Sequence, residues 1–438
     1  MVGDYAGKGR ARLRAAVLRQ FYLAPRQALL PQFSLRDWER NYSWLDASGL
    51  ALYFYDLVTS QGMESSVPLK VLERLQRNLS DNQARTRRMF EEAVDINEAF
   101  RGHGLRYLNL KGFTLFPDFC LVPSLRNQFD LDFLMPLGEA AGCCEALSRL
   151  GYRVTGGSER MLEFKAGEDQ PPSVDALYQP RPQRSVEVHF VPPGPDEKYG
   201  VSELSFERAG MRTWGGYDFA SLSEAELFMA QAFHIFWHLQ SEWTRASWLV
   251  ELRNAVKAHY HHEDFWIALR EASHATALAG TALAVALALG EIVFGDFAPR
   301  GLTEWTVNTL SARQRTWIER YGMRLLLSDF PGSKLYLLLQ KELGLGSREE
   351  RRRKLFPLHG PPSLVRRQTS TAANVRAVAA ELRYWSLRIR FHALETARYA
   401  IEAQCWEKVA ASSDQRRSFS ESATTLPASP GVYGGRDS

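Results

Sequence analysis

Two aspartates, Asp130 and Asp132, are separated by one residue in a stretch where charged and apolar residues alternate. In a β-strand, successive side chains point to opposite faces, so both carboxylates would share one face while Phe129, Leu131 and Phe133 face a core. Neighbouring buried carboxylates repel each other and lose hydration, and a cation or a raised pKa usually offsets that cost. The pattern therefore indicates either a divalent-metal site or an edge strand with two solvated aspartates.

A third carboxylate, Glu187, lies on a predicted strand over residues 185–191, where it shares a face with His189. If this strand neighbours the aspartate strand, three carboxylates meet. Two-metal phosphoryl-transfer sites use shared acidic ligands to hold two cations roughly 3.5–4 Å apart. His189 would then bind phosphate or metal, although the pattern alone favours an ordinary half-buried strand histidine.

Lys111 and Gly112 stand where a predicted strand, residues 105–110, turns into a short helical segment. Glycine lets the backbone approach a phosphate closely, and the amides at a helix N-terminus favour anions. A glycine after a strand is also typical of an ordinary turn, so these two residues alone do not identify a phosphate site.

The segments that must position these residues mix short strands with helices. Apolar residues at helical spacing predict helices between 35 and 104. Strands are expected at 105–110, 129–135, 152–155, 160–164 and 185–191, with a helix over 139–150. Further helices are expected at 224–239, 245–260, 265–277 and 278–294, with at least two more between 304 and 343. This order predicts an α+β fold.

Changes in composition divide the chain into five predicted parts. They are a helical N-terminal region (1–104), an α+β core (105–222), a helical domain (223–345), basic C-terminal helices (346–411) and a disordered tail (412–438). A break is expected at Pro361–Pro362, and residues 365–410 are expected to form a helix or a helical hairpin. The tail is predicted from its serine, glycine and polar content.

The overall composition is that of an ordinary globular protein. Of 438 residues, 45% are apolar and 24% are charged, and the formal net charge of +4 requires no polyanionic partner. The four cysteines form no CxxC pair, which favours a reducing cytoplasm. We find no signal peptide. The apolar stretch at 275–290 falls short of the ~20 residues of a membrane span and predicts a buried helix.

Two further groups could carry function. His234 and His238 share a helix face, but a zinc protease needs Glu after the first His, where Ile235 stands. A structural or substrate-facing pair is therefore favoured over a zinc site.

The C-terminal region is basic, with eleven Lys/Arg against three Glu between Arg348 and Arg390. Its aromatic residues Tyr384, Trp385 and Phe391 could stack on bases. The charge pattern nevertheless favours a solvated helix face with the aromatics turned to the core, so nucleic acid is the less favoured partner.

Taken together, these motifs resemble the uncharacterised bacterial nucleotidyltransferase family, a branch of the polymerase-β-like nucleotidyltransferase superfamily. The resemblance rests on Leu110-Lys111-Gly112, Arg126 four residues before Asp130-Leu131-Asp132, Leu150-Gly151-Tyr152, and Val186-Glu187-Val188-His189-Phe190. The helices on either side also fit, so the resemblance extends over residues 30–300.

The resemblance implies a small mixed β-sheet core with a helical lead-in and a helical C-terminal domain. Asp130, Asp132 and Glu187 would be the catalytic residues and would hold two Mg²⁺ ions, while Lys111, Gly112, Arg126 and His189 would bind substrate. Phe113 stands where many superfamily members have Ser, so contact with phosphate would fall to Lys111 or Thr114.

The reaction implied is transfer of a nucleotide from an NTP to an acceptor hydroxyl, with release of pyrophosphate. The partners would be the NTP and an unknown acceptor. One alternative is a catalytically inert module that binds a nucleotide or a partner on the same fold. Another is a nucleic-acid-binding scaffold that uses the basic C-terminal helices.

Overall fold

The computed structural model describes residues 3–22, 29–167, 177–179, 185–191, 201–241, 243–355 and 371–424. The chain forms two compact units. The first comprises residues 1–310 and 321–333, and the second comprises residues 311–320 and 334–438. The finer division into five parts stays a prediction. Within the described residues, no helix is both long and apolar enough to cross a membrane.

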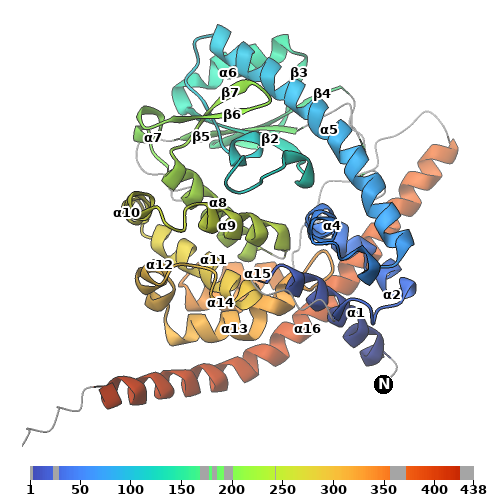
Figure 1. Ribbon diagram of the computed structural model, residues 1–438, viewed down its shortest axis with the longest axis vertical. Helices are drawn as coiled ribbons and strands as arrows, with labels where there is room; N and C mark the ends of the chain where they lie inside the picture. The colour runs from blue at the N-terminus through green and yellow to red at the C-terminus, as the bar shows by residue number, and fades with distance from the viewer. Residues whose placement is uncertain are drawn as a thin grey trace, which may run out of the picture. The chain divides into compact units, whose positions relative to one another are not determined.

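The first unit is built on a seven-stranded mixed sheet, seen at the top of Figure 1. The strands are β1 (Leu108–Asn109), β2 (Asp130–Pro136), β3 (Tyr152–Ser158), β4 (Met161–Ala166), β5 (Ser185–Val191), β6 (Gly210–Trp214) and β7 (Tyr217–Ser221). Their order across the sheet is β3-β4-β5-β2-β1-β7-β6. The predicted α+β class is confirmed, and β2 and β5 lie side by side near the middle.

One face of the sheet packs on the long helix α5 (Leu69–Gly102) and on α6 (Ala140–Arg149). The apolar residues of β2 and β5 that alternate with the charged ones all enter this core. On α5 the core residues recur at three- and four-residue steps, so the helix presents one apolar stripe to the sheet. The residues in this core include Leu131, Phe133, Val186, Val188, Phe190, Met89, Ala93, Ile96 and Phe100.

Phe129 is an exception to the predicted alternation. It precedes β2 and is only half-buried. The guanidinium groups of Arg85 and Arg245 lie over its ring, with their Cζ atoms 5.1 Å and 4.6 Å from the centroid. The prediction that Phe129 faces the core is therefore wrong, because its ring packs against two cations rather than against α5.

Strands β6 and β7 form a hairpin that the sequence analysis did not anticipate. They pair antiparallel from Gly210–Ser221 to Trp214–Tyr217. The turn consists of Gly215 and Gly216, both with positive φ (60° and 80°), which suits the tight hairpin turn that glycine pairs favour. The hairpin extends the sheet because β7 pairs in parallel with β1.

Helices make up the rest of the first unit. Before the sheet come α1 (Gly3–Gln20), α2 (Leu35–Glu39), α3 (Tyr42–Ala47) and α4 (Leu50–Ser60). After β5 and β7 come α7 (Leu204–Glu207), α8 (Glu224–Leu239), α9 (Ala246–Ala258), α10 (Glu263–Ala272), α11 (Ala279–Phe294) and α12 (Arg300–Trp305). Almost every side chain of α11 is buried, which confirms that the apolar stretch around 275–290 is a buried helix.

The second unit is helical. It contains the first part of α13 (Ala312–Leu326), together with α14 (Tyr336–Glu342), α15 (Arg348–Leu355) and α16 (Thr371–Thr424). Buried tryptophans join these helices: the indole N–H of Trp317 donates to the Leu335 carbonyl (3.1 Å), and that of Trp406 donates to Glu342 (2.8 Å). The break predicted at Pro361–Pro362 lies outside the described residues.

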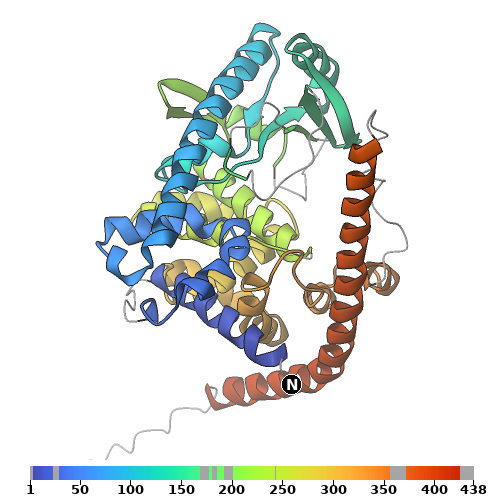
Figure 2. The same cartoon turned by 90° about the vertical axis from the view of Figure 1, so that its right-hand side faces the viewer.

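Helix α16 is one continuous helix rather than a hairpin, and Figure 2 shows that it curves along its length. It runs to Thr424, beyond the point at 412 where the sequence predicts a disordered tail. The chain from Ser412 to Thr424 has no glycine or proline, and Pro427 is the first helix breaker that follows. Tyr384, Trp385 and Phe391 on α16 are half-buried.

Candidate active site

The candidate site lies on the face of the sheet opposite the α5–α6 core. Strands β2 and β5 run parallel, and their register sets Asp132 directly beside Glu187 and Leu134 beside His189. One ligand atom from each of Asp132, Glu187 and His189 lies within 4.8 Å of the other two. Asp130 lies two residues before Asp132, beside Ser185, and is not part of this three-residue cluster. The predicted strand alternation thus brings two of the three carboxylates into direct proximity.

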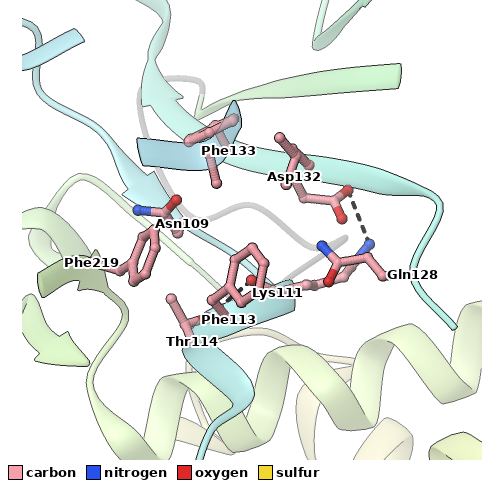
Figure 3. Close-up of a pocket in the computed structure, with 10 residues that line it drawn as sticks. Asn109, Lys111, Phe113, Thr114, Gln128, Asp132, Phe133 and Phe219 are labelled. Carbon is pink, nitrogen blue, oxygen red and sulfur yellow. Dashed lines mark hydrogen bonds and ion pairs between the residues drawn. The ribbon is translucent and has the colours of Figure 1, made fainter. Parts of the chain in front are cut away.

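Lys111 and His189 surround the Asp132 carboxylate. The Lys111 Nζ lies 3.2 Å from Asp132 Oδ1, as Figure 3 shows, and His189 Nε2 lies 3.5 Å from the same oxygen. His189 Nε2 is also 3.7 Å from Glu187 Oε2. The Asp132 side chain is 1% exposed and that of Glu187 is 29% exposed, so the site is deep at Asp132 and open to solvent at Glu187.

The three carboxylates differ in their electrostatics. Burial acts to raise the pKa of Asp132, but the charge of Lys111 and the hydrogen bond from His189 outweigh it and hold the pKa below its usual value. Burial, followed by the charges of Asp132 and Asp130, raises the pKa of Glu187 to about 7. Burial and the Asp132 charge also raise the pKa of Asp130. Negative charge is therefore in excess here, and a cation would relieve it.

The turn after β1 fixes Lys111 beside the aspartates. Gly112 has a φ of +73°, and a Cβ on it would lie 2.4 Å from the side-chain nitrogen Nε2 of Gln128. That same nitrogen donates to the Asp130 carbonyl at 2.8 Å. Glycine is thus needed both for the backbone conformation and for the close approach of the turn to the segment before β2.

The Thr114 hydroxyl has a hydrogen-bond partner within its own turn. Its side chain is fully buried, and its hydroxyl donates to the Lys111 carbonyl at 3.2 Å, as seen in Figure 3. The hydroxyl closes the turn instead of facing a ligand. Among the residues of this turn, Lys111 is the one whose side chain reaches the Asp132 carboxylate.

Comparison with protein families fits this geometry. A family model described as an uncharacterised nucleotidyltransferase matches residues 34–295. The chain belongs to this family. Neither the curated proteins nor the solved structures gave a match. The matched segment includes every predicted site residue, from Lys111 to His189, and both flanking groups of helices.

Arg126, which the sequence predicts to bind substrate, pairs with a carboxylate of α9, and its contact with substrate stays a prediction. Its Nε lies 3.2 Å from Oε1 of Glu251 on α9, and the Tyr53 hydroxyl donates to the same oxygen at 3.0 Å. Burial acts to lower the pKa of Arg126, and the Glu251 charge outweighs it. The guanidinium therefore anchors the segment before β2 to α9 instead of contacting Asp132 or Glu187.

Residues from the helices after the sheet also lie near Lys111. His234 and His238 on α8 lie 4.5 Å apart between ring centroids, and each lies 4.4 Å from the ring of Trp248. Burial, followed by the Lys111 charge, lowers the pKa of His234 well below its ordinary value. The pair forms an aromatic cluster, and among the described residues it contributes to no group of metal ligands.

Arg245, Glu251 and Arg85 were missed by the sequence analysis. They stand 45 to 121 residues from the aspartates in the chain, on or beside helices α5 and α9. None belongs to a local motif with the aspartates. Only the folded chain brings them to the segment before β2.

The residues present fit a divalent cation. Asp132 Oδ2 is buried and has no hydrogen-bond partner among the described residues. Carboxylate oxygens are the ligands that Mg²⁺ prefers, and a neutral imidazole suits Mn²⁺ or Zn²⁺ better. With Glu187 open to solvent, the group Asp132–Glu187–His189 offers donor atoms on one side and access on the other.

Proposed function

We propose that this protein transfers a nucleotide from an NTP to a hydroxyl of an acceptor, with release of pyrophosphate, in a reaction that depends on divalent metal ions. The observation that carries the proposal is the pairing of Asp132 with Glu187 across β2 and β5, where Asp132 Oδ2 has no hydrogen-bond partner in the part of the chain that the structure describes. Membership of a nucleotidyltransferase family supports the reaction class.

Asp130, Asp132 and Glu187 would hold the metal ions, which we take to be two Mg²⁺. When bound, such ions neutralise phosphate oxygens and lower the pKa of an attacking hydroxyl. His189, whose Nε2 faces both Asp132 and Glu187, would orient these carboxylates. We also propose that His189 contacts a phosphate oxygen of the NTP.

Lys111 would have two successive partners. In the structure its ammonium group lies 3.2 Å from the Asp132 carboxylate and neutralises it. A cation held by Asp132 would take over that role and free the ammonium group for the triphosphate. The turn at Gly112 lets the backbone come close to the same phosphates.

We further infer, from the order and spacing of the motifs, that the family is a bacterial branch of the polymerase-β-like nucleotidyltransferase superfamily. The four free thiols support a cytoplasmic site of action. The partners in this proposal are an NTP and an acceptor whose identity the residues do not specify.

The test is transfer itself. The protein is incubated with each of the four labelled NTPs, Mg²⁺ and a small-molecule and macromolecular extract, and labelled products are separated from the NTP. We expect a Mg²⁺-dependent labelled product from wild type and none from Asp132→Asn. Absence of a product from wild type with every NTP would contradict the proposal.

A second candidate function is an inert nucleotide-binding module. It is favoured by one observation, the engagement of the Thr114 hydroxyl within its own turn where many superfamily members offer a serine to phosphate. The two candidates differ in outcome, because the inert module binds NTP with metal yet gives no transfer to any acceptor fraction.

A further inference from the structure

Three guanidinium groups converge on residues 126–130, the short segment that leads into β2. Arg126 lies within this segment, and Arg85 reaches it from α5. Arg245, the residue just before α9, also reaches it. Arg85 donates to Asn127 Oδ1 at 3.2 Å and to the carbonyls of Gln128 and Leu177. Arg245 donates to the Asn127 carbonyl at 3.3 Å. This segment ends at Asp130, so the arginines stand beside the candidate site.

Two of the three positive charges are well satisfied. Arg126 is paired with the buried Glu251 carboxylate at 3.2 Å. Arg85 is held by three oxygen acceptors, and its planar group also covers one side of the Phe129 ring. These contacts explain both side chains as structural ties between helices and the segment before β2.

Arg245 is different. Among the described residues it has no carboxylate within ion-pair distance, and its one hydrogen bond goes to a neutral carbonyl. The rest of its contacts are ring faces, with Cζ 4.6 Å from the Phe129 centroid and 5.7 Å from that of Trp248. The side chain is half-buried. Most of its five N–H donors therefore have no hydrogen-bond acceptor among the described residues.

The electrostatics agree with this geometry. Burial, followed by the like charge of Arg126, lowers the pKa of Arg245 to about 10. The group stays charged at neutral pH, and the charges of Asp130 and Glu251 act on it from beyond ion-pair distance. An anion that entered beside Asp130 would gain this guanidinium as a partner at little further cost in desolvation.

We propose that Arg245 binds a phosphate group of the NTP, so that α9 supplies a substrate contact that the strand motifs do not contain. The inference rests on the proposed function for the identity of the ligand. A guanidinium matches a phosphate through two parallel N–H donors, whereas an ammonium group acts as a point charge. Stacking between Phe129 and Trp248 would hold the guanidinium plane in a fixed orientation for that contact.

The test measures phosphate binding apart from transfer. Binding of inorganic tripolyphosphate without metal, and of ATP with Mg²⁺, is measured by calorimetry for wild type, Arg245→Gln and Arg245→Lys. The control is Arg253→Gln, because Arg253 is also half-buried on α9, also donates to a backbone carbonyl and also lies over an aromatic ring, that of Phe294 at 5.4 Å. Thermal unfolding shows that each variant is folded.

We expect Arg245→Gln to weaken both ligands by roughly tenfold or more, as for loss of a charge-assisted hydrogen bond. Arg245→Lys should lose less affinity than Arg245→Gln, and Arg253→Gln should bind both ligands as tightly as wild type does. If Arg245→Gln does not fold, Arg245→Lys decides the test. Weaker binding of both ligands by Arg245→Lys then supports the inference, and wild-type affinity overturns it. Unchanged affinity in folded Arg245→Gln also overturns it. Weaker binding of tripolyphosphate together with unchanged binding of ATP would show that Arg245 does not bind a phosphate of the NTP.

These outcomes separate the inference from the proposed function. A wild-type protein that never transfers a nucleotide contradicts the proposed function, yet the binding of ATP and tripolyphosphate would still report on Arg245. Conversely, an active enzyme whose affinity does not depend on Arg245 would leave the proposed function standing and remove this contact from it.

Discussion

Asp132 and Glu187 occupy directly opposite positions on two parallel strands, β2 and β5, and their side chains point to the same face of the sheet. Lys111 neutralises the first at 3.2 Å, while the second remains partly open to solvent. This asymmetry gives the two carboxylates different proton affinities.

The stability of the metal-free protein should depend on the protonation of Glu187. Its pKa of about 7 in the folded protein lies above the ordinary value of 4.5, so between these values the folded state binds more protons than the unfolded state. The free energy of unfolding should therefore fall as pH rises from about 4.5 to about 7. In Glu187→Gln this decline should be smaller. The measurement is urea unfolding of both proteins in EDTA at pH 5 and pH 8; an identical pH dependence in the two would contradict the raised pKa.

Replacing Lys111 should leave Asp132 as a buried, poorly compensated charge. Loss of one partner of a buried ion pair costs about 3–5 kcal/mol, so Lys111→Met should lower the free energy of unfolding by about 3 kcal/mol in EDTA. Mg²⁺ should restore part of this loss, and NTP affinity should be weakened. Lys165→Met is the control, because Lys165 is 34% exposed in its pair with Glu163 and should cost less than about 1 kcal/mol. No restoration by Mg²⁺ would argue against a cation at Asp132.

Gly112→Ala should disturb the turn after β1 through a clash that a comparable glycine lacks. Gly104 has a similar φ of +67° but nothing within 4 Å of a Cβ, whereas a Cβ at Gly112 meets Gln128 at 2.4 Å. Gly104→Ala should cost about 1 kcal/mol from its backbone conformation alone. Gly112→Ala should cost more and should also weaken NTP binding. Thermal unfolding and calorimetry test this, and equal losses of stability in the two variants would show that the Gln128 contact is unimportant.

The basic helix α15 should bind nucleic acid only weakly. Its cations include the exposed Arg352 and Arg353, and the half-buried aromatics of α16 offer limited stacking surface. Binding of a labelled single-stranded oligonucleotide should fall roughly tenfold or more between 50 and 200 mM salt, because it would rest on phosphate contacts. Fluorescence anisotropy at the two salt concentrations measures it. Tight binding that resists salt and depends on base sequence would show that this surface is a specific reader.

Local patterns predicted much of the sheet but little of what surrounds the site. Alternation along β2 and β5 was enough to place Leu131 and Val186 in the core and Asp132 and Glu187 on the other face, because strand geometry alone determines this. The same rule failed at Phe129, where two distant cations replace the core as packing partners. No spacing rule connects those residues, since tertiary folding alone brings α5 and α9 together at the segment before β2.

The hairpin of β6 and β7 was missed for a related reason. None of the β6 residues is fully buried, and the hairpin gains its place in the sheet because β7 pairs with β1, which is two residues long. The role of Arg126 also depended on context. Its position four residues before Asp130 suggested a substrate contact, whereas the partner that decides its orientation is Glu251 on α9.

The most direct measurement is Mg²⁺-dependent binding of NTPs by calorimetry, for wild type and for the double variant Asp130→Ala, Asp132→Ala. Glu145→Gln, an exposed carboxylate on α6 that pairs with Arg149, serves as the control for loss of negative charge. We predict that wild type and the control bind at least one NTP more tightly when Mg²⁺ is present, and that the double variant loses this gain in affinity. If the folded double variant binds Mg²⁺ and NTP as tightly as wild type, the aspartates of β2 are not the metal site.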